Sequence, residues 1–487
     1  MQDNMEAFQE AAKLDLGRPY VETKLIEIGP VVAEAKIAFE RVDKWAAHDR
    51  LPFDLAWFPL KPTVRKEPKG VVLMVVPFNL PIWIAIGPLA SAIAAGCAVA
   101  IKPSELTPHF GALLAELLPK YLDPTLYTVV NGTVPQVGAL LDLQWDHILY
   151  TGGGRVARII LSAAAKTLSP VSTELGGKSP CIVNSDCDLR LAARRILWGK
   201  LCNAGQVCTA PDYVLVQRDF APKLVDAFKA TLQEFYPGGA AKSDSYSRMI
   251  NHSHFKRVQG LIESTRGHIV YGGGTNEDTL FIEPTLVLNV HHDDPLMQEE
   301  IFGPALPIVL VDNMDEALEF INSRDHPLAL YAFTRSSEFK EKVANNTQSG
   351  AISFNETIFH AAVDGLPFGG IGASGSGWHT GKFGFDTFTH LRAQIDAPGW
   401  MEFILKGRNP PYSEEKAKAI MNIMWPKLPP RPLPLTHVQA IERYKKPKGW
   451  SNMFLLALAL FTGLGLLQAR RSGLLGQVLD LVKARGA

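Results

Sequence analysis

The segment Val71-Val72-Leu73-Met74-Val75-Val76-Pro77-Phe78-Asn79-Leu80-Pro81 opens with six consecutive apolar residues and closes with a turn that two prolines bound. A short, valine-rich apolar run is typical of a strand that is buried on both faces of a parallel sheet. We expect a helix rich in small residues at 82–95 and a second strand at 97–101. The segment therefore begins a strand–helix–strand unit, and Asn79 lies just beyond the end of its first strand.

The same alternation continues along the chain. We expect a helix at 110–118 and further strands at 126–130 and 147–150. Strands that alternate with helices predict an α/β fold, with a mostly parallel sheet covered on both faces. Ligands of such sheets bind beyond the carboxyl ends of the strands. The polar and glycine residues that fall there are Asn79, Lys102, Glu105 and Gly152.

Composition limits the possible functions. A chain of 487 residues is long enough for two or three domains. The 49 basic residues equal the 49 acidic ones, so we expect no nucleic-acid partner. Five scattered cysteines argue against a disulfide framework, and we expect neither a metal site nor a secretory signal.

The C-terminal part has a different composition. Residues 450–469 carry no charge, and lysines precede them while arginines follow. Roughly 20 apolar residues span a bilayer, and basic flanks suit lipid headgroups. We expect a transmembrane anchor here, with a buried helix of a globular domain as the alternative. Residues 407–449 are expected to form a proline-rich tether with a short helix near 413–424.

One cysteine has the surroundings of a reactive thiol, in the stretch Asn203-Ala204-Gly205-Gln206-Val207-Cys208-Thr209-Ala210-Pro211. Cys202 is six positions away, which is neither a zinc-ligand spacing nor a redox Cys-x-x-Cys. Gly205 permits a bend that turns the sulfur and its own N–H toward one pocket. Two interpretations stay open: Cys208 is a nucleophile whose proton is removed, or it is a small buried hydrophobe.

Two further features are candidates for cofactor binding. The turn Gly152-Gly153-Gly154-Arg155-Val156-Ala157 lies between a strand and an expected helix, where a backbone can approach a pyrophosphate. An ordinary glycine turn is the alternative. Lys102 and Glu105 follow a strand and suit a ribose, with Glu105 accepting from hydroxyls and Lys102 donating; a solvated charge pair is equally consistent with them.

Three other segments combine glycines with reactive side chains. Glu174 precedes two glycines at the edge of an apolar region and suits a general base, with a solvated loop glutamate as the alternative. Residues 299–304 put a carboxylate and an aromatic ring before a tight turn. Residues 366–375 form a second glycine-dense loop, which is consistent with turn chemistry alone.

Taken together, these segments resemble the aldehyde dehydrogenase superfamily. The matching segments, in the family's order, are 77–81, 102–105, 152–157, 174–180, 205–213, 299–304 and 366–375. The run from Leu366 to Phe388 resembles the class 3, membrane-anchored fatty aldehyde dehydrogenases in particular.

The resemblance implies an α/β fold with a Rossmann-type cofactor domain, an α/β catalytic domain and a small bridging arm that pairs two subunits as a homodimer. The expected boundaries are an NAD(P)-binding domain with bridging segments at 1–175, a catalytic domain at 176–375, an oligomerisation arm at 376–406, the tether at 407–449, the anchor at 450–469 and a tail at 470–487. Asp15–Pro19 resembles a stretch that usually lies some tens of residues in, so we also expect a leading helical segment to be missing.

The resemblance also assigns catalytic roles. Cys208 would attack the aldehyde carbonyl and form a thiohemiacetal, which becomes a thioester after hydride transfer to NAD, or alternatively NADP. The Asn79 amide and the Cys208 backbone N–H would form the oxyanion hole. Glu174 would activate the water that hydrolyses the thioester.

The cofactor roles are implied in the same way. Lys102 and Glu105 would hold the adenosine ribose, and Gly152 and Gly153 the pyrophosphate. Glu300 and Phe302 would hold the nicotinamide ribose and ring. The family turn often reads Gly-Ser-Thr-x-x-Gly, so Gly153 and Gly154 replace its polar pair and Ala157 replaces its last glycine.

The resulting prediction is NAD(P)-dependent oxidation of medium- to long-chain fatty aldehydes to carboxylic acids, by an enzyme held to a membrane with its catalytic domain cytoplasmic. An aromatic-aldehyde dehydrogenase of the same class and a catalytically silent, membrane-tethered homologue are the alternatives. An acylating dehydrogenase would be expected to lack the hydrolytic glutamate, whereas Glu174 is present.

Overall fold

The computed structural model describes residues 1–55 and 57–424. The described residues fall into two units, one within 1–398 and the other from residue 399 to residue 424. The predicted anchor at 450–469 lies outside the described residues, as do the predicted tail and most of the tether. In the described part of the chain, no helix combines the length and the apolar character that a membrane span needs.

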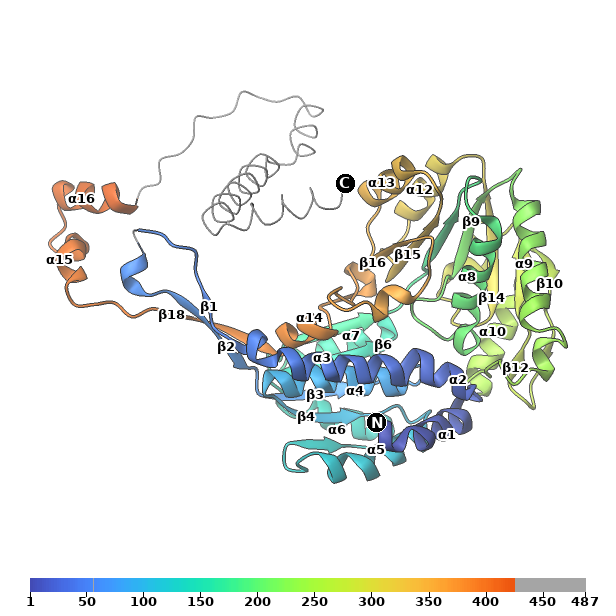
Figure 1. Ribbon diagram of the computed structural model, residues 1–487, viewed down its shortest axis with the longest axis horizontal. Helices are drawn as coiled ribbons and strands as arrows, with labels where there is room; N and C mark the ends of the chain where they lie inside the picture. The colour runs from blue at the N-terminus through green and yellow to red at the C-terminus, as the bar shows by residue number, and fades with distance from the viewer. Residues whose placement is uncertain (56, 425–487) are drawn as a thin grey trace, which may run out of the picture. The chain divides into compact units, whose positions relative to one another are not determined.

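A six-stranded sheet forms one half of the first unit (Figure 1). Its strands, in spatial order, are β17 (Gly375–Ser376), β7 (Val171–Leu175), β6 (His147–Gly152), β3 (Val71–Val75), β4 (Ala98–Lys102) and β5 (Tyr127–Val129). All neighbours pair in parallel except β17, which is antiparallel to β7. The parallel arrangement places the ends of β3, β4 and β6 along one edge.

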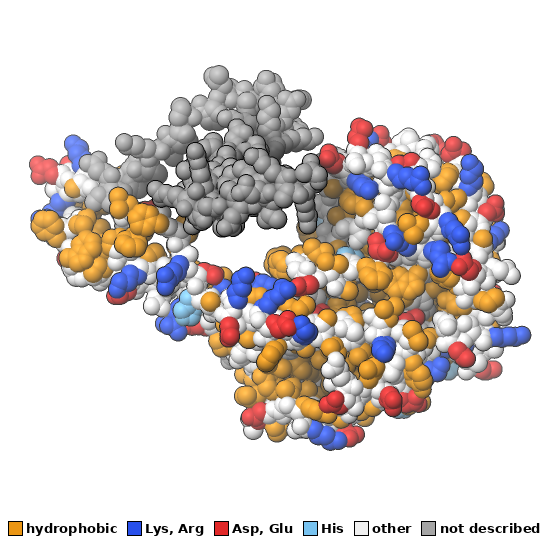
Figure 2. Space-filling model, viewed as in Figure 1, with side chains coloured by type: hydrophobic (Ala, Val, Ile, Leu, Met, Phe, Trp, Pro, Cys, Tyr) orange, Lys and Arg blue, Asp and Glu red, His pale blue; other side chains and the backbone are white. Residues whose placement is uncertain are grey.

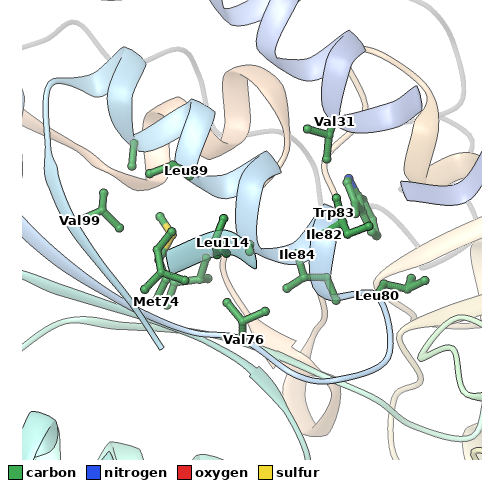
Figure 3. Packing of buried hydrophobic residues seen from close by; sticks show 14 of the residues in the cluster. Val31, Met74, Val76, Leu80, Ile82, Trp83, Ile84, Leu89, Val99 and Leu114 are labelled. Carbon is green, nitrogen blue, oxygen red and sulfur yellow. The ribbon is translucent and has the colours of Figure 1, made fainter. Parts of the chain in front are cut away.

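Helices cover both faces of this sheet. They are α1 (Met5–Leu16), α2 (Tyr20–Thr23), α3 (Gly29–Ala46), α4 (Pro81–Ala95), α5 (Pro108–Tyr121), α6 (Val134–Leu141) and α7 (Gly154–Ala164). Side chains alternate across a strand, so Met74 packs with α3, α4 and α5, whereas its neighbour Leu73 packs with α6 and α7. Figure 3 shows Val31 of α3 above Trp83 of α4, and Leu114 of α5 beside Met74.

A seven-stranded sheet forms the other half of the unit. Its strands, in spatial order, are β10 (His268–Tyr271), β13 (Thr285–Leu288), β14 (Ala305–Val311), β9 (Tyr213–Gln217), β8 (Pro180–Val183), β15 (Ala329–Phe333) and β16 (Ala351–Phe354). Only β10 runs antiparallel to its neighbour. The surrounding helices are α8 (Leu189–Leu201), α9 (Ala221–Phe235), α10 (His252–Ser264), α11 (Pro295–Gln298), α12 (Met314–Asn322) and α13 (Ser337–Asn346). The helix α14 (Gly381–Thr387) instead packs against α3 and α4 of the first half.

An arm extends from the first unit (Figure 1). It is a three-stranded antiparallel sheet of β1 (Asp49–Arg50), β2 (Thr63–Pro68) and β18 (Thr389–Gln394). Figure 2 shows hydrophobic side chains gathered toward the outer end of the arm. The large apolar residues exposed on the arm are Leu51, Phe53, Leu55, Trp57, Phe58, Leu391 and Ile395. The second unit contains α15 (Met401–Leu405) and α16 (Glu414–Met424) among its described residues.

The predicted α/β class and the alternation of elements are confirmed. Each strand and helix expected between residues 71 and 150 is present, and the largest boundary difference is at α5, which ends at Tyr121 rather than 118. The helix expected near 413–424 is α16. The strand β7 was not expected, because glycines directly follow it.

Candidate active site

The loop that carries Cys208 makes a sharp turn directly after α8. Asn203, Ala204 and Gly205 all have left-handed backbone angles, with φ of +52°, +53° and +79°. A Cβ at Gly205 would lie 2.2 Å from the carbonyl oxygen of Gly303, so only glycine fits there. The bend that the sequence predicted at Gly205 is therefore present.

Cys208 is buried, with 9% of its surface exposed, and it lines two cavities. One is a small apolar pocket. The other has a volume of about 320 Å³ and is also lined by Asn79 and Glu174. Burial raises the pKa of the Cys208 thiol, and the negative charges of Glu174 and Glu300 raise it further. The resting thiol therefore holds its proton and needs a base to become a nucleophile.

Glu174 lies in β7 and is buried, with 3% of its surface exposed. The alternative of a solvated loop glutamate is therefore wrong. Its Oε2 accepts a hydrogen bond from Thr151 Oγ1 over 3.2 Å and lies 2.7 Å from Nε2 of His379. Within the described residues, its Oε1 is buried without a hydrogen-bond partner. One carboxylate oxygen is thus held, and the other is free to take a proton.

His379 is the site residue that sequence reasoning missed. Burial lowers the pKa of its imidazole, but the carboxylates of Glu174 and Glu34 more than offset this, and the pKa is raised. Its ring packs against Trp83 and Phe368. It belongs to the 366–388 run, but 205 positions separate it from Glu174, so no local spacing joins the two.

The glycine-dense loop at 366–375 contributes to the same place. Gly375 forms the short strand β17 and pairs with Glu174, and a Cβ on Gly375 would lie 2.2 Å from the carbonyl oxygen of Thr173. At Gly370, a Cβ would meet the carbonyl oxygen of Ser374 at 2.0 Å. Close backbone packing therefore accounts for these glycines.

Asn79 lies at the end of the turn that follows β3 and is 3% exposed. Its backbone carbonyl accepts a hydrogen bond from Nδ2 of Asn203 over 3.0 Å, which ties this turn to the loop of Cys208. Asn79 and Cys208 both line the larger cavity, as the strand-end argument predicted for Asn79.

The adenosine-site candidates lie at the end of β4. Lys102 is buried, with 2% exposed, and its Nζ donates to the carbonyl of Pro103 over 2.5 Å and to Glu105 over 3.3 Å. The alternative of a solvated pair is therefore wrong for Lys102, although the Glu105 side chain is 42% exposed. Neither residue lines the cavity of Cys208.

The glycine turn has the geometry of an anion site. Gly152 has a φ of +156°, and a Cβ there would lie 2.3 Å from the Tyr150 hydroxyl. Gly153 is the N-cap of α7, and a Cβ there would meet nothing within 4 Å. Open space thus lies in front of a helix N-terminus, where backbone N–H groups attract a phosphate. Ala157 is buried in the first turns of this helix, as close packing requires.

Glu300 and Phe302 complete the lining of the larger cavity. Burial and the nearby Asp212 raise the pKa of Glu300 to about 8, although Lys178 and Lys200 oppose the rise. The Phe302 ring meets Phe78 edge-on, with centroids 5.8 Å apart. The cavity therefore brings seven of the predicted residues together: Asn79, Gly152, Gly153, Glu174, Cys208, Glu300 and Phe302.

A thiol, a carboxylate and an amide at the strand ends of a Rossmann-type sheet are the parts of a cysteine-dependent oxidoreductase. Comparison with known proteins identifies the family. Residues 1–393 match the aldehyde dehydrogenase family, so the chain belongs to that family and acts on aldehydes as an oxidoreductase. Its class 3 resemblance is likewise confirmed.

Three relatives illustrate the similarity. The chain is 48% identical to aldehyde dehydrogenase family 3 member A2 of Mus musculus over 353 residues, which is 72% of each chain. It is 44% identical to the dimeric NADP-preferring aldehyde dehydrogenase of Canis lupus familiaris, covering 79% of this chain and 84% of the relative. The substrate-bound structure of Staphylococcus aureus AldH superposes with a TM-score of 0.83 at 39% identity, covering 86% of this chain and 91% of that one.

Proposed function

We propose that the chain oxidises medium- to long-chain aldehydes to carboxylic acids with NAD, using Cys208 as its nucleophile. The observation that carries this proposal is the position of Cys208 between two cavities of different character. The larger cavity holds Glu174 and Asn79, and the smaller one is apolar. Cys208 can thus meet a carbonyl carbon whose alkyl chain lies on one side and whose reacting groups lie on the other.

Cys208, Asn79 and Glu174 would each have a separate role in the reaction. The Cys208 thiol gives up its proton to water in the larger cavity, and its sulfur attacks the carbonyl carbon. The oxygen that becomes negative is stabilised by the Asn79 amide and the Cys208 N–H. Such a donor typically raises kcat about 100- to 1,000-fold. After hydride leaves the thiohemiacetal, Glu174 takes a proton from water through its free Oε1, and the resulting hydroxide hydrolyses the thioester.

The nicotinamide cofactor supplies the hydride acceptor when it is bound. Gly152 and Gly153 would contact its pyrophosphate, and Lys102 with Glu105 its adenosine ribose. Glu300 and Phe302 would hold the nicotinamide end, in line with their place beside Cys208. We propose NAD because Glu105 suits a free 2′-hydroxyl, although the canine relative is named NADP-preferring.

The apolar pocket supports the substrate class. The side chains around it are almost all hydrophobic, and those that line it include Leu25, Ile26, Trp83, Trp198, Ile358 and Phe359. Trp198 and Phe359 face each other with ring centroids 5.3 Å apart. Such walls favour an alkyl chain, and the three aromatic rings make an aromatic aldehyde the second candidate substrate.

Membrane anchoring and pairing of subunits belong to the same proposal. The uncharged run at 450–469 would hold the enzyme at a lipid surface, where long-chain aldehydes partition. The exposed apolar side chains of the arm would pack against a second copy in a homodimer, as the name of the canine relative suggests. The domain boundaries near 175 and 375 are proposed on the same family basis.

Formation of NADH tests the proposal. Purified protein in detergent would be assayed with hexadecanal, with benzaldehyde and, as a control, with Cys208→Ser. We expect turnover with hexadecanal that exceeds turnover with benzaldehyde and disappears in the variant. Turnover with benzaldehyde alone would contradict the fatty-aldehyde assignment, and undiminished turnover in Cys208→Ser would contradict the assigned nucleophile.

A further inference from the structure

Arg18 is a fully buried arginine that none of the roles above uses. It lies between α1 and α2 in the Asp15–Pro19 segment, with 0% of its surface exposed. A buried guanidinium gives up its hydration, so protein groups must satisfy both its charge and its N–H donors. Its partners therefore show what it holds in place.

The guanidinium contacts three separate segments. Nη1 donates to Glu27 Oε1, Nη2 donates to the backbone carbonyl of Asn79, and Nε donates to Asn203 Oδ1 over 3.2 Å. Nδ2 of Asn203 donates to the same Asn79 carbonyl over 3.0 Å. One planar group thus joins the N-terminal segment, the turn that carries Asn79 and the loop that leads to Cys208.

Glu27 extends this link to the start of α4. It is 0% exposed, and its Oε2 accepts the backbone N–H groups of Ile82 over 2.7 Å and of Trp83 over 3.0 Å. These are donors of the first helical turn, which have no partner within their helix. The turn at Asn79 is therefore held on both sides, by Arg18 at its carbonyl and by Glu27 at the helix.

The loop side of the link is equally constrained. The N–H of Asn203 donates to Glu22 over 2.8 Å, its Nδ2 donates to the carbonyl of Gln206 over 3.1 Å, and Gln206 donates back over 2.9 Å. A left-handed angle at a non-glycine residue is unfavourable and persists only when its surroundings fix it. Asn203 is such a residue, so these contacts set the path of the chain toward Cys208.

We propose that Arg18 is a positioning residue for aldehyde oxidation, which fixes the Asn79 amide relative to the Cys208 thiol. The inference rests on the proposed oxyanion role of Asn79. An oxyanion donor works only when it lies about 2.7–3.1 Å from the developing charge. Lysine at position 18 would keep the charge, but a single ammonium cannot replace the fork that reaches Glu27, Asn79 and Asn203 together.

A double-mutant cycle in the full-length protein tests this proposal. Asn79→Ala should lower kcat about 100- to 1,000-fold, and Arg18→Lys about 100-fold, the loss expected for a misplacement of about 1 Å. In Asn79→Ala protein, Arg18→Lys should add little further loss, because the donor that it positions is gone. The KM for NAD should stay unchanged in Arg18→Lys. The matched control is Arg218→Lys, a surface arginine paired with Asp312, which should keep the wild-type kcat.

A second variant, Asn203→Gly, tests the same link if Arg18→Lys does not fold. Asn203→Gly accepts the left-handed angle without strain and removes only the side chain that links the loop to the Asn79 carbonyl. It should show the same loss of kcat and the same lack of additivity with Asn79→Ala. Leu232→Ala, at a buried position in α9, is the control for stability. Its kcat shows how much activity is lost when the protein is destabilised away from the active site.

The outcomes are separable. Three outcomes would each overturn the role of Arg18. The first is that the losses of kcat multiply in the double variant, and the second is a wild-type kcat in both Arg18→Lys and Asn203→Gly. The third is an equal loss of kcat in Leu232→Ala when that variant is equally destabilised. A wild-type kcat in Asn79→Ala would instead contradict the proposed oxyanion role, and the inference with it.

Discussion

Replacing Glu174 by glutamine keeps the shape of the side chain and removes its charge. Oε2 of Glu174 lies 2.7 Å from Nε2 of His379 and 3.2 Å from the Thr151 hydroxyl, and a glutamine oxygen can accept both contacts. The amide cannot, however, take a proton from water. General-base catalysis typically contributes about 100- to 10,000-fold, so kcat of Glu174→Gln should fall by a factor in this range.

Rapid mixing with aldehyde and NAD locates the step that is lost. Hydride transfer precedes hydrolysis, so Glu174→Gln should release about one NADH per active site in a burst and then turn over slowly. Thioester hydrolysis would be the slow step. A steady-state rate close to that of the wild type would refute the role of Glu174, and absence of the burst would place its action at Cys208 instead.

The same substitution changes how stability depends on pH. Burial lowers the pKa of His379, but the Glu174 carboxylate reverses this and raises it. Stability from the pair is therefore fully present below the unfolded-state pKa of about 6.5 and is lost as pH rises through the folded-state pKa.

Removal of one partner from a buried ion pair costs about 3–5 kcal/mol, which is an upper bound here because His379 can release its proton. The difference in unfolding free energy between wild type and Glu174→Gln should thus be largest near pH 6 and shrink toward about pH 9. Denaturant unfolding measures it, and a difference that grew with pH would contradict the ion pair.

Three further predictions follow from the loops and the C-terminal part. Gly205→Ala should lower the melting temperature, because its left-handed angle costs alanine about 1–2 kcal/mol and its Cβ would lie 2.2 Å from the Gly303 carbonyl; an unchanged melting curve would contradict the tight turn. Gly152→Ala should lower the melting temperature measured by calorimetry and Gly153→Ala should not, because only a Cβ at Gly152 meets another atom within 4 Å. Equal changes in the two variants would be inconsistent with this geometry. Deletion of 449–487 should move the protein from the membrane to the soluble fraction with kcat retained, and a truncated protein that stayed on membranes would disprove the anchor.

Local patterns predicted the sheet of the cofactor half well. The run at 71–76 and its successors are apolar because the strands are covered on both faces, and each was found within a few residues. The strand-end argument placed Asn79 and Gly152 correctly, because parallel strands end at one edge. The resemblance implied that Cys208 is the nucleophile and Glu174 the base, and both residues line one cavity.

Contacts between distant parts of the chain could not be predicted in this way. His379 and Glu174 are 205 positions apart, and Arg18 and Asn203 are 185 apart, so no periodicity links them. β17 is two residues long, Gly375 and Ser376, which is too short to show alternation. From the sequence, Glu174 could be interpreted as a loop residue, because the glycines that follow it are typical of a loop. In the structure it belongs to the end of a buried strand.

The central claim is that Cys208 carries the acyl group during turnover, and peptide mass spectrometry tests it most directly. Glu174→Gln would be incubated with NAD and hexadecanal, quenched in acid and digested. The account predicts one hexadecanoyl thioester on the peptide that contains Cys208, and none in Glu174→Gln/Cys208→Ser. An acyl group on Cys202, which lines the same apolar pocket, or no acyl group in protein that has formed NADH, would contradict it.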